Sequence, residues 1–261
     1  MSHLLTIDVE EWYHGLGHSA GKTNRNLSDT INDLLDVLSE TDTYATFFIL
    51  GTEVHKLKNV MHRCVAAGHE IGCHGMRHVR VNNLKPDDFH CSLNEARSLI
   101  EDATQKSCRG FRAPWFSVNP EDKWFFEILK KEGFVYDASL RIPLQSIHRK
   151  PKKYCDIIEV PVPLLECRCS RRNAGLLGGL TFRLLPKKFI QRLMHQCESN
   201  NSPLCLYLHP YEWEKKKCPA NSFSMSTIRR IMFVSQTLPK LRWLINVSAF
   251  SSIERWLNLP L

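Results

Sequence analysis

Short apolar runs of the kind found in buried strands alternate along this chain with segments of helical periodicity. The strand-like runs cover residues 4–9, 44–50, 69–73, 109–112, 134–137, 157–160 and 203–208. Apolar residues at helical spacing fill the segments between them, at 27–38, 54–65, 86–100, 124–129 and 185–198. Strands and helices in this order predict an α/β fold with a parallel sheet, and a count of about seven strands favours a barrel.

The length of 261 residues suits one large α/β domain with a substantial core and is short for two domains. We therefore expect a single domain over residues 1–261, in which residues 221–261 form a helical C-terminal extension packed on the barrel. The hydrophobic content of 43% is ordinary for a globular protein. No apolar run approaches the roughly 20 residues needed to span a bilayer.

The net charge of +8 comes from basic residues in short, scattered groups. No aromatic residues alternate with these groups, and no helix-turn-helix or finger pattern is present, so we predict no nucleic-acid partner. A surface of this charge favours an enzyme that acts near anionic substrates or makes peripheral contact with an anionic membrane. The oligomeric state is left open by the sequence.

The first strand-like run begins at Leu4, and no secretory leader is visible before it. Removal of a leader of ~15–30 residues would also remove Asp8 and Glu10, the two acidic residues at the end of this run. We therefore expect a cytoplasmic protein whose ten cysteines are reduced thiols. Cys167 and Cys169 are too isolated from other cysteines to form a structural zinc site.

Two histidines four residues apart, His74 and His78, are the clearest sign of chemistry in the chain. On a helical turn such residues share a face, so both imidazoles can reach one ion. On a strand, Asp8 and Glu10 point to the same side, because side chains alternate. Two histidines, a carboxylate ligand and a spare carboxylate are the parts of an open hydrolytic metal site. The alternative is a pair of exposed helix histidines with no ligand.

Polar residues stand at the carboxyl ends of the predicted strands, where the active sites of parallel barrels lie. Each follows or ends a different strand-like run, and the five residues are Asp8, His74, Arg112, Asp137 and His209.

Six segments of this chain resemble, in order, the motifs of the polysaccharide deacetylases (carbohydrate esterase family four, with the NodB-homology domain). They are residues 6–12, 46–51, 74–78, 111–115, 136–139 and 208–213. The resemblance implies a distorted (β/α) barrel. Residues 239–244 and 252–257 further resemble the tail of a subgroup encoded with bacterial surface-polysaccharide genes.

The first motif departs from the pattern of many family members, in which two adjacent aspartates act as base and as metal ligand. Here the sequence is Asp8-Val9-Glu10. Because Asp8 and Glu10 share a strand face, we assign Glu10 to the metal and Asp8 to the base. The reversed assignment stays open, whereas Glu11 is expected to face away.

The resemblance implies that Glu10, His74 and His78 hold a divalent metal, and the imidazole-rich set favours zinc. Arg112 is expected to pair with Asp8 and keep it ionised. His209, on the opposite side of the substrate, is then the general acid for the leaving amine.

The remaining assignments concern the surroundings of this centre. Asp137 is expected to orient His209 or to support another residue of the site. Trp115, Trp213 and Tyr211 are candidates for substrate binding, and ordinary packing is the alternative for both tryptophans. Residues 175–183 look like a mobile loop over the site, whose role the sequence does not define.

These expectations combine into a metal-dependent hydrolase that removes N-acetyl groups from a sugar. The saccharide is expected in polysaccharide, lipid-linked or nucleotide-linked form, as part of cell-surface polysaccharide metabolism. Two alternatives are an amide hydrolase of the same fold that acts on non-sugar substrates, such as an allantoinase-like enzyme, and a catalytically silent glycan-binding protein.

Overall fold

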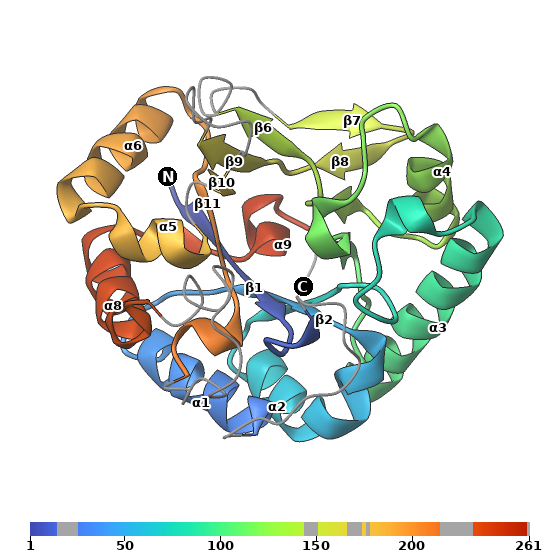
Figure 1. Ribbon diagram of the computed structural model, residues 1–261, viewed down its shortest axis with the longest axis horizontal. Helices are drawn as coiled ribbons and strands as arrows, with labels where there is room; N and C mark the ends of the chain where they lie inside the picture. Colours follow the sequence, from blue (N-terminus) through green and yellow to red (C-terminus); the bar gives the residue numbers. More distant parts are fainter. Residues whose placement is uncertain (15–25, 144–150, 166–173, 176–177, 215–231, 260–261) are drawn as a thin grey trace.

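A curled parallel sheet, open like half a barrel, forms the centre of the molecule (Figure 1). The computed structural model describes residues 1–14, 26–143, 151–165, 174–175, 178–214 and 232–259. In spatial order the strands are β11 (Cys205–Leu208), β1 (His3–Val9), β2 (Thr46–Ile49), β3 (Glu70–Cys73), β4 (Gly110–Phe111), β5 (Tyr136–Asp137), β8 (Ile157–Glu159) and β7 (Lys152–Tyr154).

All strands on this path except β7 run parallel, which confirms the predicted α/β class. Within the described residues the path ends at β11 and at β7, so the sheet is curled but not closed. The sequence did not predict β7, nor a small second sheet. That sheet consists of β10 (Ala174–Gly175), β9 (Val162–Leu165) and β6 (Arg141–Pro143).

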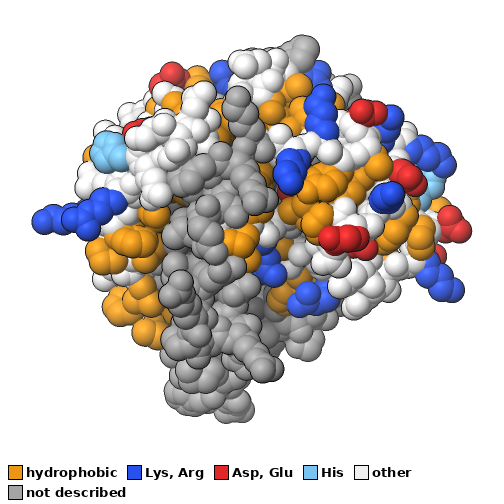
Figure 2. All heavy atoms as spheres, turned by 90° about the horizontal axis from the view of Figure 1, so that it is seen from above, with side chains coloured by type: hydrophobic (Ala, Val, Ile, Leu, Met, Phe, Trp, Pro, Cys, Tyr) orange, Lys and Arg blue, Asp and Glu red, His pale blue; other side chains and the backbone are white. Residues whose placement is uncertain are grey.

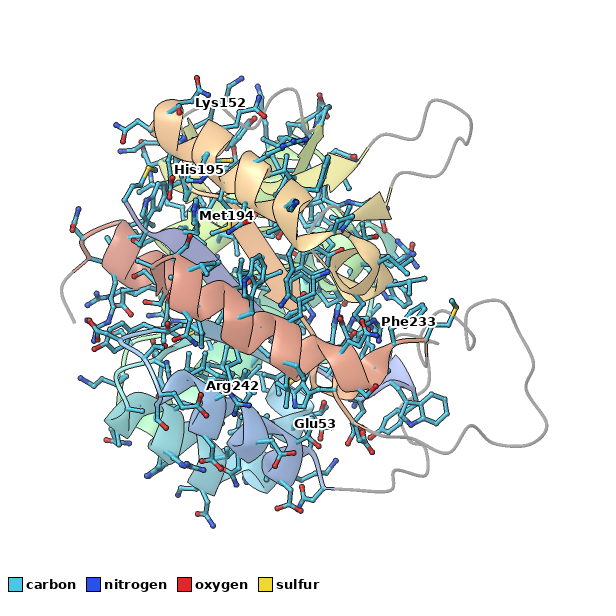
Figure 3. The ribbon with its side chains drawn as sticks, turned by 90° about the vertical axis from the view of Figure 1, so that its left-hand side faces the viewer. Glu53, Lys152, Met194, His195, Phe233 and Arg242 are labelled. Carbon is cyan, nitrogen blue, oxygen red and sulfur yellow. The ribbon has the colours of Figure 1, made fainter. Side chains whose placement is uncertain are left out.

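Helices cover the outer face of the large sheet (Figure 1). They are α1 (Leu27–Leu38), α2 (Val54–Ala66), α3 (Pro86–Thr104), α4 (Lys123–Lys131), α6 (Lys187–Ser199) and α8 (Thr237–Val247). Figure 3 shows α8 crossing the side of the molecule between α6 and α1. Arg242 of α8 donates two hydrogen bonds of 2.7 Å to Glu40, just beyond α1. None of the helices in the described ranges is both long and apolar enough to cross a membrane.

Two expectations about the second half of the chain need correction. Residues 179–184 form a helix, α5 (Gly179–Leu184), where the sequence suggested a mobile loop; residues 176–177 lie outside the description. In the C-terminal extension, residues 232–259 contain not only α8 and α9 (Ile253–Trp256) but also a strand, β12 (Phe250–Ser251). Because β12 pairs with β1, this segment is part of the central sheet.

Alternation along β1 divides its side chains between two packing layers. Leu5, Ile7 and Val9 point outward into the core between the sheet and its helices. Leu4 points inward and packs in a smaller cluster with Phe48, Tyr136 and Cys205, among others. Because side chains alternate, the polar residues that follow Leu4 at every second position also face the concave side.

A buried carboxyl group, Glu70, ties the amino ends of the strands together. It accepts hydrogen bonds from the Thr46 hydroxyl at 2.6 Å, the Tyr136 hydroxyl at 2.6 Å and the Glu254 backbone N–H at 2.9 Å. Burial raises the pKa of Glu70 to about 7. The Tyr136 ring also explains Gly110, because a Cβ there would lie 2.0 Å from the tyrosine hydroxyl. This group joins β2, β5 and α9.

We expect Tyr136→Phe to lower the free energy of unfolding by about 1–3 kcal/mol, because one oxygen of the buried Glu70 carboxyl loses its donor. Tyr154→Phe is the matched control, since the Tyr154 ring stacks on Phe126 at the surface end of the sheet. Urea unfolding followed by circular dichroism measures both variants. Equal unfolding free energies for the two variants would contradict the role given to this hydrogen bond.

Candidate active site

The two histidines of the predicted metal motif lie in a loop, not on the helical turn that their spacing suggested. His74 directly follows β3, and Gly75 adopts a φ of 85°, which favours glycine. The loop is fixed by backbone hydrogen bonds from Gly51 to Gly75 (2.9 Å) and from Thr52 to Met76 (3.0 Å). The imidazole rings nevertheless converge, with centroids 5.5 Å apart.

Both imidazoles use Nδ1 to bond a backbone carbonyl. His74 Nδ1 lies 2.8 Å from the carbonyl oxygen of Arg112, and His78 Nδ1 lies 3.1 Å from that of His14. In each case Nδ1–H is the donor, so the neutral ring carries its lone pair on Nε2. Burial lowers the pKa of His74 to about 4, which keeps this ring neutral at physiological pH. Histidines held in this way are typical of metal ligands.

Glu10 completes a set of three ligands. Potential ligand atoms of Glu10, His74 and His78 all lie within 4.8 Å of one another. The closest approach, 2.5 Å, joins Glu10 Oε2 and His78 Nε2. One carboxylate and two imidazoles that converge in this way are donors typical of a divalent metal site. The donor set therefore fits a divalent metal ion.

Asp8 lies on the same face of the strand as Glu10, but its closest partner is an arginine and not a histidine. Its Oδ1 accepts a hydrogen bond of 2.8 Å from Arg112 Nη1, and both side chains are buried. Burial alone would raise the pKa of Asp8, but the Arg112 guanidinium and the nearby imidazoles hold it below its ordinary value. Asp8 is thus an ionised carboxylate with one oxygen, Oδ2, not bonded to Arg112.

His209 follows β11 and points into the same cluster. Its Nε2 lies 3.5 Å from Glu10 Oε1 and 3.9 Å from Asp8 Oδ2, close to the base, not across from it as the sequence suggested. Its Nδ1 donates a hydrogen bond of 2.6 Å to Glu212 Oε1. The Tyr211 ring stacks on the His209 ring at 4.9 Å, and its hydroxyl donates to Glu10 across 3.4 Å.

Glu212, and not Asp137, orients His209, which corrects the sequence assignment. Asp137 instead accepts a hydrogen bond of 2.5 Å from the Ser139 hydroxyl, which itself accepts one from the Ala113 backbone N–H. Asp137 also faces Glu159 across the register of β5 and β8, and burial raises the pKa of both carboxyl groups. The role of Glu212 was not predicted from the sequence, although its i, i+3 spacing from His209 on a short helical turn was a usable signal.

The two candidate tryptophans lie in different surroundings. Trp115 is partly exposed, and its ring centroid lies 5.0 Å from that of His78. Trp213 is buried in the core, where its indole N–H donates to the Thr30 carbonyl at 2.9 Å. Trp213 therefore packs in the core, which is the alternative that the sequence left open. Its buried side chain is not placed to stack on a sugar.

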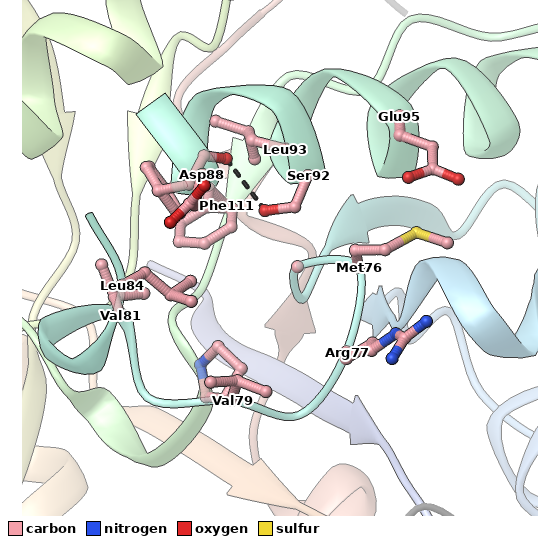
Figure 4. Close-up of a pocket in the computed structure, with 13 residues that line it drawn as sticks. Met76, Arg77, Val79, Val81, Leu84, Asp88, Ser92, Leu93, Glu95 and Phe111 are labelled. Atoms are coloured by element: carbon pink, nitrogen blue, oxygen red, sulfur yellow. Dashed lines mark hydrogen bonds between the residues drawn. The ribbon is translucent and has the colours of Figure 1, made fainter. Parts of the chain in front are cut away.

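A cavity of about 230 Å³ lies between the metal-motif loop and α3 (Figure 4). Met76 and Val79 from the loop and Leu93 from α3 line it with mainly apolar surface. Neither His74 nor His78 is among its lining residues, so this cavity is separate from the metal-binding cluster.

Comparisons with known families agree with this geometry. Residues 18–134 match the family model "Polysaccharide deacetylase", and residues 139–258 match a domain of unknown function, DUF3473. The chain carries a polysaccharide deacetylase domain. The two matched segments share one sheet, because β2, β3 and β4 lie in the first segment and β7, β8, β11 and β12 lie in the second.

Curated relatives resemble the deacetylase domain over a limited length. A putative polysaccharide deacetylase of Bacillus subtilis is 34% identical over 40% of this chain and 37% of its own length. A peptidoglycan deacetylase of Helicobacter pylori is 33% identical over 41% of this chain and 36% of its own length. A chitooligosaccharide deacetylase of Bradyrhizobium is 36% identical over 32% of this chain and 38% of its own length. The matched part thus spans less than two fifths of each of these relatives.

Among solved structures, a putative polysaccharide deacetylase from Mycobacterium smegmatis has a similar fold. The TM-score is 0.60 at 16% identity, over 100% of this chain and 93% of the other. This likeness confirms the fold of the deacetylase domain.

We expect the purified protein, incubated with Zn²⁺ and desalted, to retain about one ion per chain. His74→Ala and His78→Ala should each lose that ion because each removes one of three ligands. His62→Ala on α2 is the control, since His62 Nε2 contacts only the Ala103 carbonyl at 2.6 Å. Elemental analysis measures the metal, and circular dichroism verifies the fold. A folded His74→Ala variant with undiminished zinc would exclude this ligand set.

Proposed function

We propose that this protein is a metal-dependent hydrolase that removes N-acetyl groups from an N-acetylated saccharide in polysaccharide, lipid-linked or nucleotide-linked form. The observation that carries the proposal is the placement of Asp8. Its carboxylate is paired with Arg112 and lies 3.9 Å from His209 Nε2. Asp8 also points to the same side of the sheet as Glu10. A base, an acid and three metal ligands therefore meet at one edge of the sheet.

Glu10, His74 and His78 would hold the metal ion, for which the imidazole-rich set favours zinc. A bound divalent ion supplies Lewis-acid polarisation of the acetamide carbonyl and lowers the pKa of an attacking water. Tyr211 helps to position this set, because its hydroxyl contacts Glu10 while its ring stacks on His209.

Asp8 is suited to act as the general base. It is buried, ionised and held in one orientation by Arg112, and Oδ2 is left to accept a proton from water. Arg112 does not compete for this proton, because its guanidinium stays charged throughout.

His209 is suited to act as the general acid for the departing amine. Burial alone would lower the pKa of His209, but the hydrogen bond to Glu212 and the neighbouring carboxylates raise it to about 9. The ring is therefore protonated at neutral pH, with Nε2–H facing the reaction centre. Amines are poor leaving groups, so transfer of this proton assists cleavage of the C–N bond.

The curated relatives support a sugar substrate over a cyclic amide, because their names specify chitooligosaccharide and peptidoglycan deacetylases. We further propose that the protein acts in the cytoplasm. The described cysteines, Cys64, Cys73, Cys91, Cys108, Cys155, Cys197 and Cys205, are free thiols, which is compatible with a reducing compartment.

The zinc-loaded protein should release acetate from N-acetylated oligosaccharides and leave allantoin unchanged. Acetate is quantified enzymatically over a panel that contains chitooligosaccharides, peptidoglycan fragments, nucleotide-linked N-acetylglucosamine and allantoin. Release should stop when a chelator removes the metal and return when zinc is added. Turnover of allantoin alone would support the competing amide hydrolase. Specific glycan binding without acetate release would support the silent binding protein.

Asp8→Asn should keep its zinc and lose about 10²–10⁴-fold in kcat, because a positioned proton acceptor is removed. Glu10→Gln should instead weaken zinc affinity, since a neutral amide oxygen is a poorer donor to a dication. Zinc titration and kcat are measured on the same preparations, together with thermal stability, because Asp8→Asn also leaves the Arg112 charge without its counter-ion. Loss of zinc in Asp8→Asn beside retention in Glu10→Gln would reverse the two assignments.

His209→Ala and Glu212→Gln should both retain zinc and lose activity on acetamides, the first by more than the second. The loss should be much smaller on acetate esters of phenols, because a phenoxide leaves without the proton that an amine requires. The ratio of kcat on the two substrate types measures this effect. An equal loss on both types would argue against His209 as the proton donor.

A further inference from the structure

Two consecutive aromatic residues beside the active site have an unusual backbone conformation. Trp115 has a φ of 63° and Phe116 a φ of 52°, in the left-handed region that residues with large side chains rarely occupy. Such conformations persist only where the surrounding structure enforces them, and they gather at functional sites. Here Ser117 fixes the turn, because its hydroxyl donates to the Pro114 carbonyl at 2.7 Å.

The turn sends its two aromatic rings to different parts of the site. The Trp115 ring lies against His78 of the metal-binding set, at 5.0 Å between centroids. The Phe116 ring makes an edge contact with Tyr207 at 5.2 Å, and Tyr207 in turn contacts His209 at 5.8 Å. One ring therefore lies against a proposed metal ligand, and the other is linked to the proposed acid through Tyr207.

Each of these rings also contacts an exposed arginine. The Arg80 guanidinium lies 4.8 Å from the Trp115 ring centroid, and the Arg141 guanidinium lies 5.6 Å from that of Phe116. Cation–π contacts of this kind hold a guanidinium in place while its N–H groups stay available.

The backbone next to each arginine is anchored. The N–H of Val81, which follows Arg80, donates to the buried Ser117 hydroxyl at 2.8 Å. Arg141 begins β6, and its register partner in β9 is Val162. The two guanidinium groups are thus attached to fixed points at the border of the site.

Neither arginine has a carboxylate partner within the described part of the chain, although Arg63, Arg97, Arg109 and Arg242 each make an ion pair there. A cavity of about 420 Å³ adjoins Phe116 and Arg141, and Lys152 adds a further cation to its lining. The buried carboxyl of Glu159 also lines it, and burial raises the pKa of that group, which favours its neutral form. Figure 2 shows one face of the molecule, on which a patch of apolar side chains is bordered by both basic and acidic side chains. Two positioned guanidiniums without counter-charges are suited to bind anionic groups.

We propose that the saccharide substrate is acidic, and that Arg80 and Arg141 bind carboxylate or phosphate groups on the sugar units that flank the acetamide. This inference rests on the proposed function and adds the substrate class to it. The apolar face of a flanking sugar would lie on Trp115 or in the cavity beside Phe116, while its anionic oxygens reach the guanidinium groups.

Equilibrium binding separates this inference from the question of turnover. The zinc-loaded Asp8→Asn protein is titrated calorimetrically with a hyaluronan tetrasaccharide, which alternates N-acetylglucosamine with glucuronate, and with its neutral methyl ester. A second pair, N-acetylglucosamine 1-phosphate and the methyl glycoside of N-acetylglucosamine, tests phosphate in place of carboxylate. We expect the acid of at least one pair to bind about tenfold more tightly than its neutral partner, with the preference weakening as salt is added.

Arg80→Gln and Arg141→Gln, each in the Asp8→Asn background, should reduce this preference roughly 3- to 10-fold. Arg192→Gln on α6 removes the same charge from an exposed site on another element and should leave the preference unchanged. Equal binding of acid and neutral partner in both pairs, or an equal loss of preference in the Arg192→Gln control, would overturn the proposal. Acetate release by the wild-type enzyme is measured separately. Acetate release without a preference for the acidic partner would contradict only the acidic substrate class, whereas no acetate release from any saccharide would contradict the proposed function.

Discussion

The buried guanidinium of Arg112 connects the strands on which the site is built. It donates to Asp8 and to the Thr6 hydroxyl on β1, each at 2.8 Å, and to the Ala138 carbonyl after β5 at 3.0 Å. Its charge also lies 4.4 Å from the Phe48 ring of β2. A fully buried cation is stable only when it is paired and hydrogen-bonded, and removal of one partner of such a pair typically costs about 3–5 kcal/mol. The carboxyl edge of the sheet is thus organised around one charge that has no access to water.

The sequence predicts the framework of this site because strand alternation and strand order are local properties. The parallel strands and the five main amphipathic helices follow from periodicity, and parallel strands bring their carboxyl ends to one edge of the sheet. The same rule places Asp8 and Glu10 on one face of β1 and points Val9 to the outer core. The short strands β6 and β7 were not predicted because their residues are largely polar or partly exposed and form no buried apolar run, unlike those of the equally short β4 and β5.

Other parts of the site depend on contacts between distant segments, and for that reason the sequence could not define them. His74 and His78 converge through a loop that is fixed by the backbone of Gly51 and Thr52, so the helical turn expected from their spacing is not what brings the two rings together. Asp137 stands at a strand end as predicted, yet its partners are Ser139 and Glu159 because β8 lies beside β5. Motif position therefore located these residues, and packing determined what each one does.

The geometry also explains how the proposed base, Asp8, and the proposed acid, His209, coexist at a separation of 3.9 Å. Without other partners, an ionised Asp8 and a protonated His209 at this distance could exchange the proton that catalysis requires each to handle separately. Arg112 favours the ionised form of Asp8, whereas Glu212 accepts the Nδ1 hydrogen bond of His209 and favours its protonated form. The pKa of Asp8 is lowered and that of His209 is raised, so the two protonation states are stabilised by different partners, one after β4 and the other after β11. Substitution of either partner should therefore disturb one proton transfer and leave the other in place.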